Sequence, residues 1–161
     1  VRRTVIHPDG VGRAGVPPEV DLALIELEAA MSGITPADLQ TETNELGKTL
    51  IIVGYGDFGA PGAIVRTDRR RRAVMNVVHD AGPRRVFMRF DRPPAGLELE
   101  GVGGPGDSGG PALVERGGQV IVVGVSSASM DGKPGQYGVT DVYTRVSSYV
   151  GWIERVIAGQ G

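Results

Sequence analysis

Short apolar runs of strand length recur along the chain, and clusters of glycine, proline and aspartate bound each of them. This pattern predicts strands near residues 1–8, 21–27, 48–55, 71–78, 86–90, 111–115, 119–127 and 139–145. The glycine- and proline-rich stretch 9–20 predicts a loop, and the polar, mixed stretch 28–45 predicts a connector. No long helical pattern falls between the strands, which favours an antiparallel barrel or sandwich.

The end of the chain has a helical pattern instead. Ser147 and Ser148 can cap a helix, and Gly159 can end it. Between them the apolar residues fall at helical spacing, at Tyr149, Val150, Ile153, Val156 and Ile157. We therefore expect a single C-terminal helix that docks on a β domain.

Composition limits the classes of protein that fit. Of the 161 residues, 40% are hydrophobic, which is enough for a packed core despite 26 glycines and 11 prolines. With 17 Lys and Arg against 19 Asp and Glu, a general polyanion-binding surface and a nucleic-acid partner are not expected. The absence of cysteine excludes disulfides, thiol catalysis and Cys-ligated zinc, and two histidines are too few for a multi-histidine metal site. No apolar run approaches the roughly 20 residues that span a bilayer, so no membrane partner is expected.

The sharpest chemical signal is the segment 104–111, Gly-Pro-Gly-Asp-Ser-Gly-Gly-Pro, in which four glycines surround Ser108. Glycine allows backbone geometry that side chains block, and such a turn can aim its N–H groups at one point. A hydroxyl at that point can attack an acyl carbonyl while the N–H groups hold its oxygen. A glycine-rich hairpin loop without chemistry is the alternative.

Residues 106–111, Gly-Asp-Ser-Gly-Gly-Pro, resemble the nucleophile motif of trypsin-like serine endopeptidases, which have the chymotrypsin fold. Further segments resemble this family in the family's order: His7-Pro8 with 21–27, then 53–56, 123–127, 141–146, and finally Tyr149, Trp152 and Ile153. The resemblance implies an all-β, chymotrypsin-like double antiparallel β-barrel with a C-terminal helix. Residues 1–45 would hold a remnant of the first barrel and the interdomain connector, and residues 46–161 the complete second barrel with the helix.

The resemblance also implies roles for individual residues. Ser108 would be the nucleophile that attacks a polypeptide substrate, and the backbone N–H groups of Gly106 and Ser108 would form the oxyanion hole. Asp21 would orient a catalytic histidine, although a turn residue at the start of a strand is the alternative. Asp107 would pair with a freed N-terminal amine and hold the oxyanion turn in its active shape. No cofactor is expected.

The catalytic histidine is the main departure from the family. A serine hydroxyl needs a base to remove its proton, and in the triad template the histidine precedes the aspartate by about 45 residues. Only 20 residues precede Asp21; His7 lies in a His-Pro turn 14 positions before it, and His79 lies in the second half of the chain. We expect the histidine in an N-terminal segment that is a separate chain, was cleaved or is missing from the sequence. The apolar-alternating start at Val1, which is not a methionine, fits this expectation.

Three stretches would line the primary specificity pocket. Val102, six positions before the serine, lies where a basic-specific trypsin has an aspartate. Ser127 and Ser129 would belong to the cleft strand, and Asp141 to the far wall. An inward Asp141 could bind a Lys or Arg side chain, whereas an outward one would leave an apolar pocket beside Val102. The cost of an unpaired buried carboxylate favours an exposed or hydrogen-bonded Asp141.

The arginine run 69–72, with Arg66 nearby, could bind an acidic substrate or a polyanion, but a solvated loop is the simpler interpretation. Taken together, these features predict a secreted or periplasmic serine endopeptidase. The lack of cysteine suggests a bacterial type, since secreted animal relatives usually carry several disulfides. The alternative function is a protease-like binding or scaffold module that has lost its histidine.

Overall fold

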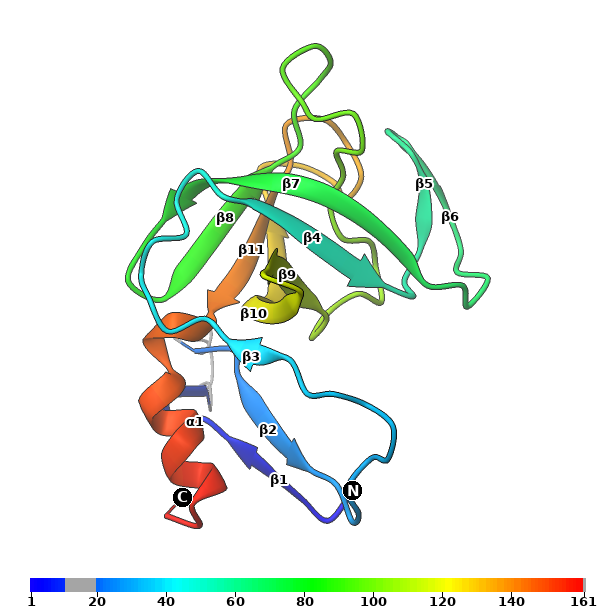
Figure 1. Ribbon diagram of the computed structural model, residues 1–161. Helices are drawn as coiled ribbons and strands as arrows, with labels where there is room; N and C mark the ends of the chain where they lie inside the picture. Colours follow the sequence, from blue (N-terminus) through cyan, green and yellow to red (C-terminus); the bar gives the residue numbers. More distant parts are fainter. Residues whose placement is uncertain (11–19, 161) are drawn as a thin grey trace.

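Six antiparallel strands close into a barrel in the computed structural model, which describes residues 1–10 and 20–160 (Figure 1). These strands are β4 (Thr49–Gly54), β7 (Arg72–Ala81), β8 (Arg85–Arg89), β9 (Pro111–Arg116), β10 (Gln119–Met130) and β11 (Thr140–Arg145). Their spatial order is β11-β8-β7-β4-β9-β10, and a pairing between β10 and β11 closes the barrel. Each strand overlaps a predicted one, so the antiparallel barrel expected from the sequence is confirmed.

Alternating apolar side chains fill the barrel. In β4 the side chains of Leu50 and Ile52 are buried, and in β8 those of Val86 and Met88 are buried between more exposed neighbours. The core cluster consists of Leu50, Ile52, Val78, Val86, Met88, Ala112, Val123 and Tyr143. Full burial of each large aliphatic side chain contributes about 1.5–3 kcal/mol. The barrel is therefore a rigid platform for the loops at its ends.

The long strand β10 pairs with β9 along its first part and with β11 along its second part. Its register shifts twice, between Val122 and Gly124 and between Ser126 and Ala128. A bulge bends the strand that carries it and redirects the extra side chain. Ser127 is the extra residue of the second bulge and lies outside the regular ladder.

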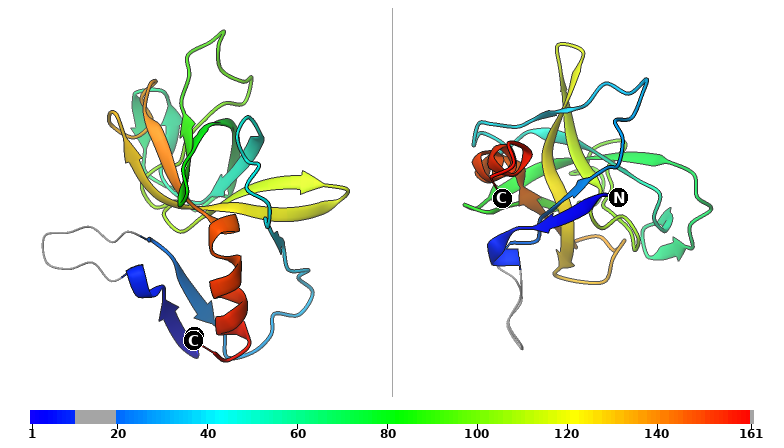
Figure 2. Two further views of the ribbon diagram at one scale, coloured as in Figure 1. Left: turned by 90° about the vertical axis from the view of Figure 1, so that its left-hand side faces the viewer. Right: turned by 90° about the horizontal axis from the view of Figure 1, so that it is seen from below.

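A second apolar cluster joins the helix to the first part of the chain. β1 (Arg3–Ile6) and β2 (Ala23–Glu26) form an antiparallel two-stranded sheet, and α1 (Val150–Ile157) lies on the same side of the barrel (Figures 1 and 2). The buried members of the cluster are Val20, Leu22, Val146, Tyr149 and Ile153. Ile6 is 54% exposed and Ile25 is 61% exposed, so this small sheet leaves apolar surface uncovered.

The helix begins differently from the prediction. A 3-10 turn, η2 (Val146–Ser148), contains both serines, and the N-cap residue of α1 is Tyr149, which makes no side-chain cap hydrogen bond. The Ser147 hydroxyl instead donates to Glu45, and the Ser148 hydroxyl donates to a carbonyl of the turn between β7 and β8. The predicted serine cap is therefore wrong, because tertiary acceptors take both hydroxyls.

The turn expected at His7-Pro8-Asp9-Gly10 contains the 3-10 element η1 (Pro8–Gly10). Three short strands were not predicted: β3 (Asp38–Leu39), β5 (Phe58–Ala60) and β6 (Ala63–Val65). β3 adds to β10 in parallel, and β5 pairs with β6 in a hairpin. Two or three residues are too few to produce a recognisable period. Gly159, which follows the C-cap residue Ala158, has a φ of +79°, which agrees with the predicted end of the helix. Most of the predicted loop 9–20 lies outside the described residues.

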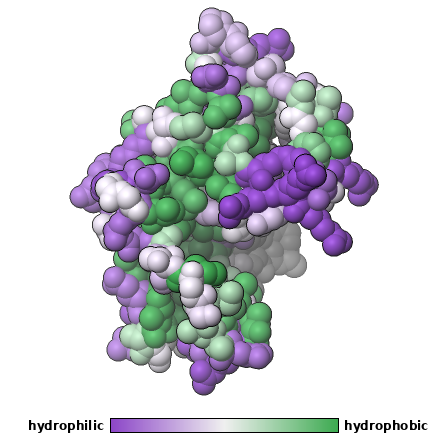
Figure 3. All heavy atoms as spheres, turned by 45° about the vertical axis from the view of Figure 1, so that its right-hand side comes forward, coloured by the Kyte–Doolittle hydropathy of each residue, from purple (hydrophilic) through white to green (hydrophobic). Residues whose placement is uncertain are grey.

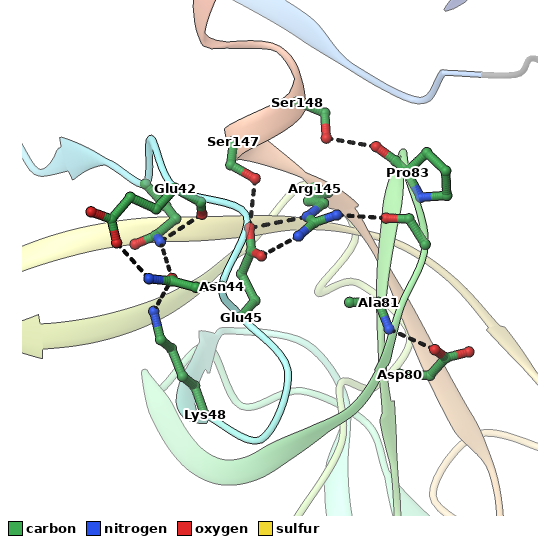
Figure 4. Close-up of polar contacts among 12 residues, drawn as sticks. Glu42, Asn44, Glu45, Lys48, Asp80, Ala81, Pro83, Arg145, Ser147 and Ser148 are labelled. Carbon is green, nitrogen blue, oxygen red and sulfur yellow. Dashed lines mark hydrogen bonds and ion pairs between the residues drawn. The ribbon is translucent and has the colours of Figure 1, made fainter.

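A buried ion pair anchors the connector to the barrel (Figure 4). Glu45 is fully buried, and its carboxylate accepts hydrogen bonds from Arg145, one of them from Nε at 3.1 Å. Arg145 also donates to the carbonyl of Gly82 at 2.9 Å, in the turn between β7 and β8. Burial alone would raise the pKa of Glu45, but hydrogen bonds from Arg145 and Ser147 and the positive charge outweigh it, so this pKa lies below its ordinary value.

Candidate active site

Ser108 lies at an exposed bend just before β9. Its hydroxyl has no hydrogen-bond partner among the described residues. Gly106 and Gly109 flank it with φ values of +97° and +80°, a backbone region that other L-residues rarely adopt. These two glycines let the chain reverse on either side of the serine, which leaves the hydroxyl open to solvent.

The backbone N–H groups of the bend fall into two sets. Those of Asp107, Gly109 and Gly110 donate to backbone carbonyls at 2.9–3.0 Å. Those of Gly106 and Ser108 have no acceptor within residues 1–10 and 20–160. The two unengaged groups belong to the residues from which the sequence predicted an oxyanion hole. Unengaged donors beside an exposed hydroxyl are suited to hold a developing oxyanion.

The carboxylate of Asp107 is held from two sides. The N–H of Gly56 donates to Oδ1 at 2.7 Å, and the N–H of Gly104 donates to Oδ2 at 2.8 Å. A Cβ at Gly54 would overlap Oδ1, and a Cβ at Gly56 would lie 2.6 Å from it. Glycine is therefore needed both at Gly54, the last residue of β4, and two positions later at Gly56. The resemblance of 53–56 to the family did not identify this contact, for which the paired glycines at 54 and 56 are the sequence signal.

Asp21 approaches the same region from the first part of the chain. The Ser127 hydroxyl donates to Oδ2 of Asp21 at 2.9 Å, and the Thr144 hydroxyl donates to the Asp21 carbonyl at 2.7 Å. The N–H of Gly109 donates to the carbonyl of the residue before Ser127 at 2.9 Å. A short chain of contacts thus links Asp21 to the bend that carries Ser108.

A cavity of about 230 Å³ opens beside Ser108 and contains most of the predicted pocket. Ser127, Ser129 and Asp141 all line it. Asp141 is only 2% exposed; its Oδ1 accepts a hydrogen bond from the Ser129 hydroxyl at 2.8 Å, and its Oδ2 accepts one from the N–H of Gly103 at 2.7 Å. Of the two orientations that the sequence left open, Asp141 has the inward one, with its carboxylate hydrogen-bonded.

The environment of Asp141 shifts the pKa of its carboxyl upwards. Burial raises this pKa most strongly, and the negative charge of Asp107 also raises it. The hydrogen bonds from Gly103 and Ser129 lower the pKa, but each by less than burial raises it. Burial, together with the Asp141 charge, also raises the pKa of the neighbouring Tyr143 hydroxyl. An acidic group in a partly desolvated pocket favours a cationic guest, because an ion pair is stronger where water is excluded.

Val102 is the one predicted pocket residue that does not line this cavity. It lies on the wall of a larger cavity of about 620 Å³, together with Asp107. The larger cavity extends between the end of β4, the start of β7, the β5–β6 hairpin and parts of the segments 90–104 and 135–137. The two cavities share Gly103 and Gly104, so they meet at the loop that precedes Ser108.

Neither histidine lines either cavity. The ring of His7 packs on the helix side of the molecule, with its centroid 4.9 Å from that of Trp152 and 5.2 Å from that of Tyr149. Its Nδ1 accepts a hydrogen bond from the N–H of Asp9 at 3.2 Å. His79 is exposed on β7, within the register shift between β7 and β8.

The part of the chain that the structure describes contains no cluster of three or more His, Cys, Asp or Glu side chains that could hold a metal ion. Within the same residues, no helix has the length and apolar character needed to cross a membrane.

Comparisons with known proteins identify the class. A family model described as Trypsin matches residues 1–153, and the chain belongs to this family. Its fold is similar to that of neuropsin, a serine protease expressed in the limbic system of mouse brain, with a TM-score of 0.74 at 21% identity; the match covers 98% of this chain and 70% of that one. The fold is thus chymotrypsin-like, with a complete second barrel and a C-terminal helix.

The curated relatives include a snake venom serine protease and a thrombin-like enzyme. The snake venom serine protease PTLE1 of Gloydius halys is 30% identical over 148 residues, and the thrombin-like enzyme saxthrombin of Gloydius intermedius is 32% identical over 149 residues. Each match covers 86% of this chain and 55% of the relative. The chain therefore spans about half the length of these relatives.

Proposed function

We propose that the chain is the carboxyl-terminal part of a serine endopeptidase that hydrolyses peptide bonds by acyl transfer through Ser108. The observation that carries this proposal is the exposed hydroxyl of Ser108 beside the unengaged N–H groups of Gly106 and Ser108. In this mechanism the Ser108 oxygen attacks the scissile carbonyl, and the two N–H groups hold the oxyanion that forms. The leaving amine departs with a proton, and water then hydrolyses the acyl-enzyme.

The base of this mechanism would be a histidine from polypeptide outside this chain. His7 is packed against aromatic side chains of the helix region, and His79 is exposed on a barrel strand, so neither is placed to take a proton from Ser108. Asp21, tethered by Ser127, would orient that histidine and stabilise its charged form. The uncovered apolar side chains of β1 and β2 support a further segment packing there, with residues 1–45 as the partial first barrel and residues 46–161 as the second.

The Asp107 carboxylate would serve as the switch of the oxyanion turn. It lines the large cavity and accepts hydrogen bonds from two backbone N–H groups, which leaves further lone pairs for a cationic partner. A freed N-terminal amine entering this cavity would pair with it and hold the serine bend in its active shape.

The cavity beside Ser108 would accept a Lys or Arg side chain of the substrate. Asp141 supplies the negative charge, in place of an acidic residue at Val102. Its two present hydrogen bonds use only part of the acceptor capacity of a carboxylate, so a guanidinium or ammonium can still bind. We also propose that the protein is secreted, because PTLE1 is by name a venom protease and venom is a secretion. We further propose that the absence of cysteine reflects a bacterial source.

Labelling with a peptidyl phosphonate tests the peptidase proposal. The full-length protein is expected to form an adduct at Ser108, found by peptide mass mapping, and the Ser108→Ala variant none. The chain on its own is expected to label far more slowly, because it lacks the base. Absence of labelling in the folded full-length protein would instead support the binding-module alternative.

A further inference from the structure

The segment 66–72, called here the arginine loop, concentrates positive charge on one face. It contains five arginines and one aspartate, a net charge of +4, while the whole chain carries −2; the remaining residues therefore carry −6. All of its residues are exposed except Arg72, which is half-buried. Figure 3 turns the side that carries β5, β6 and the start of β7 forward, and a dense hydrophilic region stands out there. This charge is the reverse of that of the rest of the protein.

The loop neutralises only part of its own charge. Asp68 pairs with Arg72 at 2.7 Å and with Arg70 at 3.7 Å. The Arg72 guanidinium also lies 3.6 Å above the centre of the Phe58 ring, which fixes the base of the loop. The other three arginines, Arg66, Arg69 and Arg71, have no carboxylate partner among the described residues.

Hydrogen bonds tie this loop to the candidate active site. The N–H of Thr67 donates to Oδ1 of Asp57 at 2.8 Å, and the Thr67 hydroxyl donates to the carbonyl of Tyr55. The N–H of Asp57 in turn donates to the carbonyl of Pro105 at 2.8 Å. Pro105 lines the cavity beside Ser108. Two hydrogen bonds in series, through Asp57, thus connect the arginine loop to Pro105, which lies in the segment that carries the serine.

We propose that the arginine loop binds acidic residues of the polypeptide substrate, in a part of the substrate that extends beyond the cavity beside Ser108. This inference rests on the proposed peptidase function. Guanidinium groups bind carboxylates through paired, charge-assisted hydrogen bonds, and three of them are unused here. A short acidic peptide segment contacts only this positively charged loop. A long polyanion would also contact the rest of the protein, whose net charge of −6 would repel it.

The test is equilibrium binding of a fluorescein-labelled peptide that carries a run of glutamates, measured by fluorescence anisotropy with the chain at low and physiological salt. A peptide with glutamines in place of the glutamates is the control ligand. We expect the variant R66Q/R69Q/R71Q to bind the acidic peptide at least about tenfold more weakly, a loss of about 1.4 kcal/mol. The matched variant R85Q/R116Q/R155Q, which removes the same charge from other exposed positions, is expected to change binding less than about twofold.

If both variants bound the acidic peptide equally weakly, the proposal would be overturned, because the effect would then come from the net charge of the protein and not from this loop. Binding of a sulfated oligosaccharide with no binding of the glutamate peptide would also overturn it, in favour of a polysaccharide partner. Circular dichroism of both variants checks that they are folded. Since anisotropy needs no hydrolysis, failure of this inference is distinguishable from failure of labelling at Ser108.

Discussion

The hydroxyl of Ser127 donates a hydrogen bond of 2.9 Å to Oδ2 of Asp21, although the two residues are 106 positions apart in the sequence. The contact depends on a bulge, because Ser127 is the one residue of β10 that the register shift leaves without a partner on β11. A regular strand would turn this side chain to the other face of the barrel. The bulge therefore joins the first part of the chain to the rim that carries Ser108.

Removing this hydroxyl should weaken the support of Asp21. A buried hydrogen bond to a charged group contributes about 1.5–3 kcal/mol, and because Asp21 is exposed we expect a loss of about 1 kcal/mol for Ser127→Ala. In the full-length protein this corresponds to a roughly fivefold lower kcat on a peptide substrate. Ser148→Ala, which removes a hydroxyl bound to a distant carbonyl, is the control and should leave kcat unchanged. An unchanged kcat in Ser127→Ala would contradict a role for this contact.

Gly54→Ala should disturb the serine bend through Asp107. The new Cβ would overlap the Asp107 carboxylate, so either the side chain or the end of β4 has to move. Overpacking of this kind costs about 1–3 kcal/mol, which urea unfolding of the chain can measure. Gly151→Ala on the exposed face of α1 is the control, since its Cβ meets only a flexible arginine at 3.6 Å and alanine favours a helix. A Gly54→Ala protein as stable as the parent would show that the bend is not held by this contact.

Glu45→Gln should destabilise the chain strongly. The substitution leaves the Arg145 guanidinium buried without its counter-charge, and breaking a buried pair in this way costs about 3–5 kcal/mol. Urea unfolding at neutral pH measures the loss. The double variant with Arg145→Met removes both charges and is expected to recover part of the stability. If Glu45→Gln cost no more than an exposed substitution such as Glu28→Gln, the pair would not be needed to hold the connector.

The same ion pair predicts a pH dependence. The pKa of Glu45 in the folded chain lies below its ordinary value, so its contribution to stability is complete above the pKa of the unfolded chain. This contribution is lost as the pH falls through the lower folded pKa. Unfolding free energies measured from neutral pH down to acid should therefore fall more steeply in the parent chain than in Glu45→Gln. If the unfolding free energies of the parent chain and of Glu45→Gln changed equally with pH, the lowered pKa of Glu45 would be contradicted.

Asp141→Asn tests the charge of the pocket. In the full-length protein we expect kcat/KM on Arg and Lys substrates to fall by at least about tenfold, while cleavage after small apolar residues changes little. Because burial raises the pKa of Asp141, its charge is present only above that raised value, and the preference for basic side chains should strengthen as the pH rises through it. A substrate library measured at several pH values checks both effects. A basic preference that persists in Asp141→Asn would assign the charge to another residue.

Some features of the site follow from local pattern. The glycines around Ser108 predict a sharp, exposed bend, because other residues rarely adopt a left-handed φ such as the +97° at Gly106. The apolar runs predict the barrel strands because burial of alternate side chains is the main stabilising contribution to a sheet. The predicted serine cap was wrong because it depends on a contact that local pattern does not show. The Ser147 hydroxyl donates to Glu45, which is 102 positions away in the sequence.

Residue order alone was enough for the family motif, the barrel strands and the candidate nucleophile, since each depends on neighbours within a few positions. The inward, doubly hydrogen-bonded Asp141, the two glycines that make room for Asp107 and the anchoring of the arginine loop depend on contacts between distant segments. Such contacts exist only once the barrel has closed, because its strand order and bulges decide which backbone donors and side chains meet.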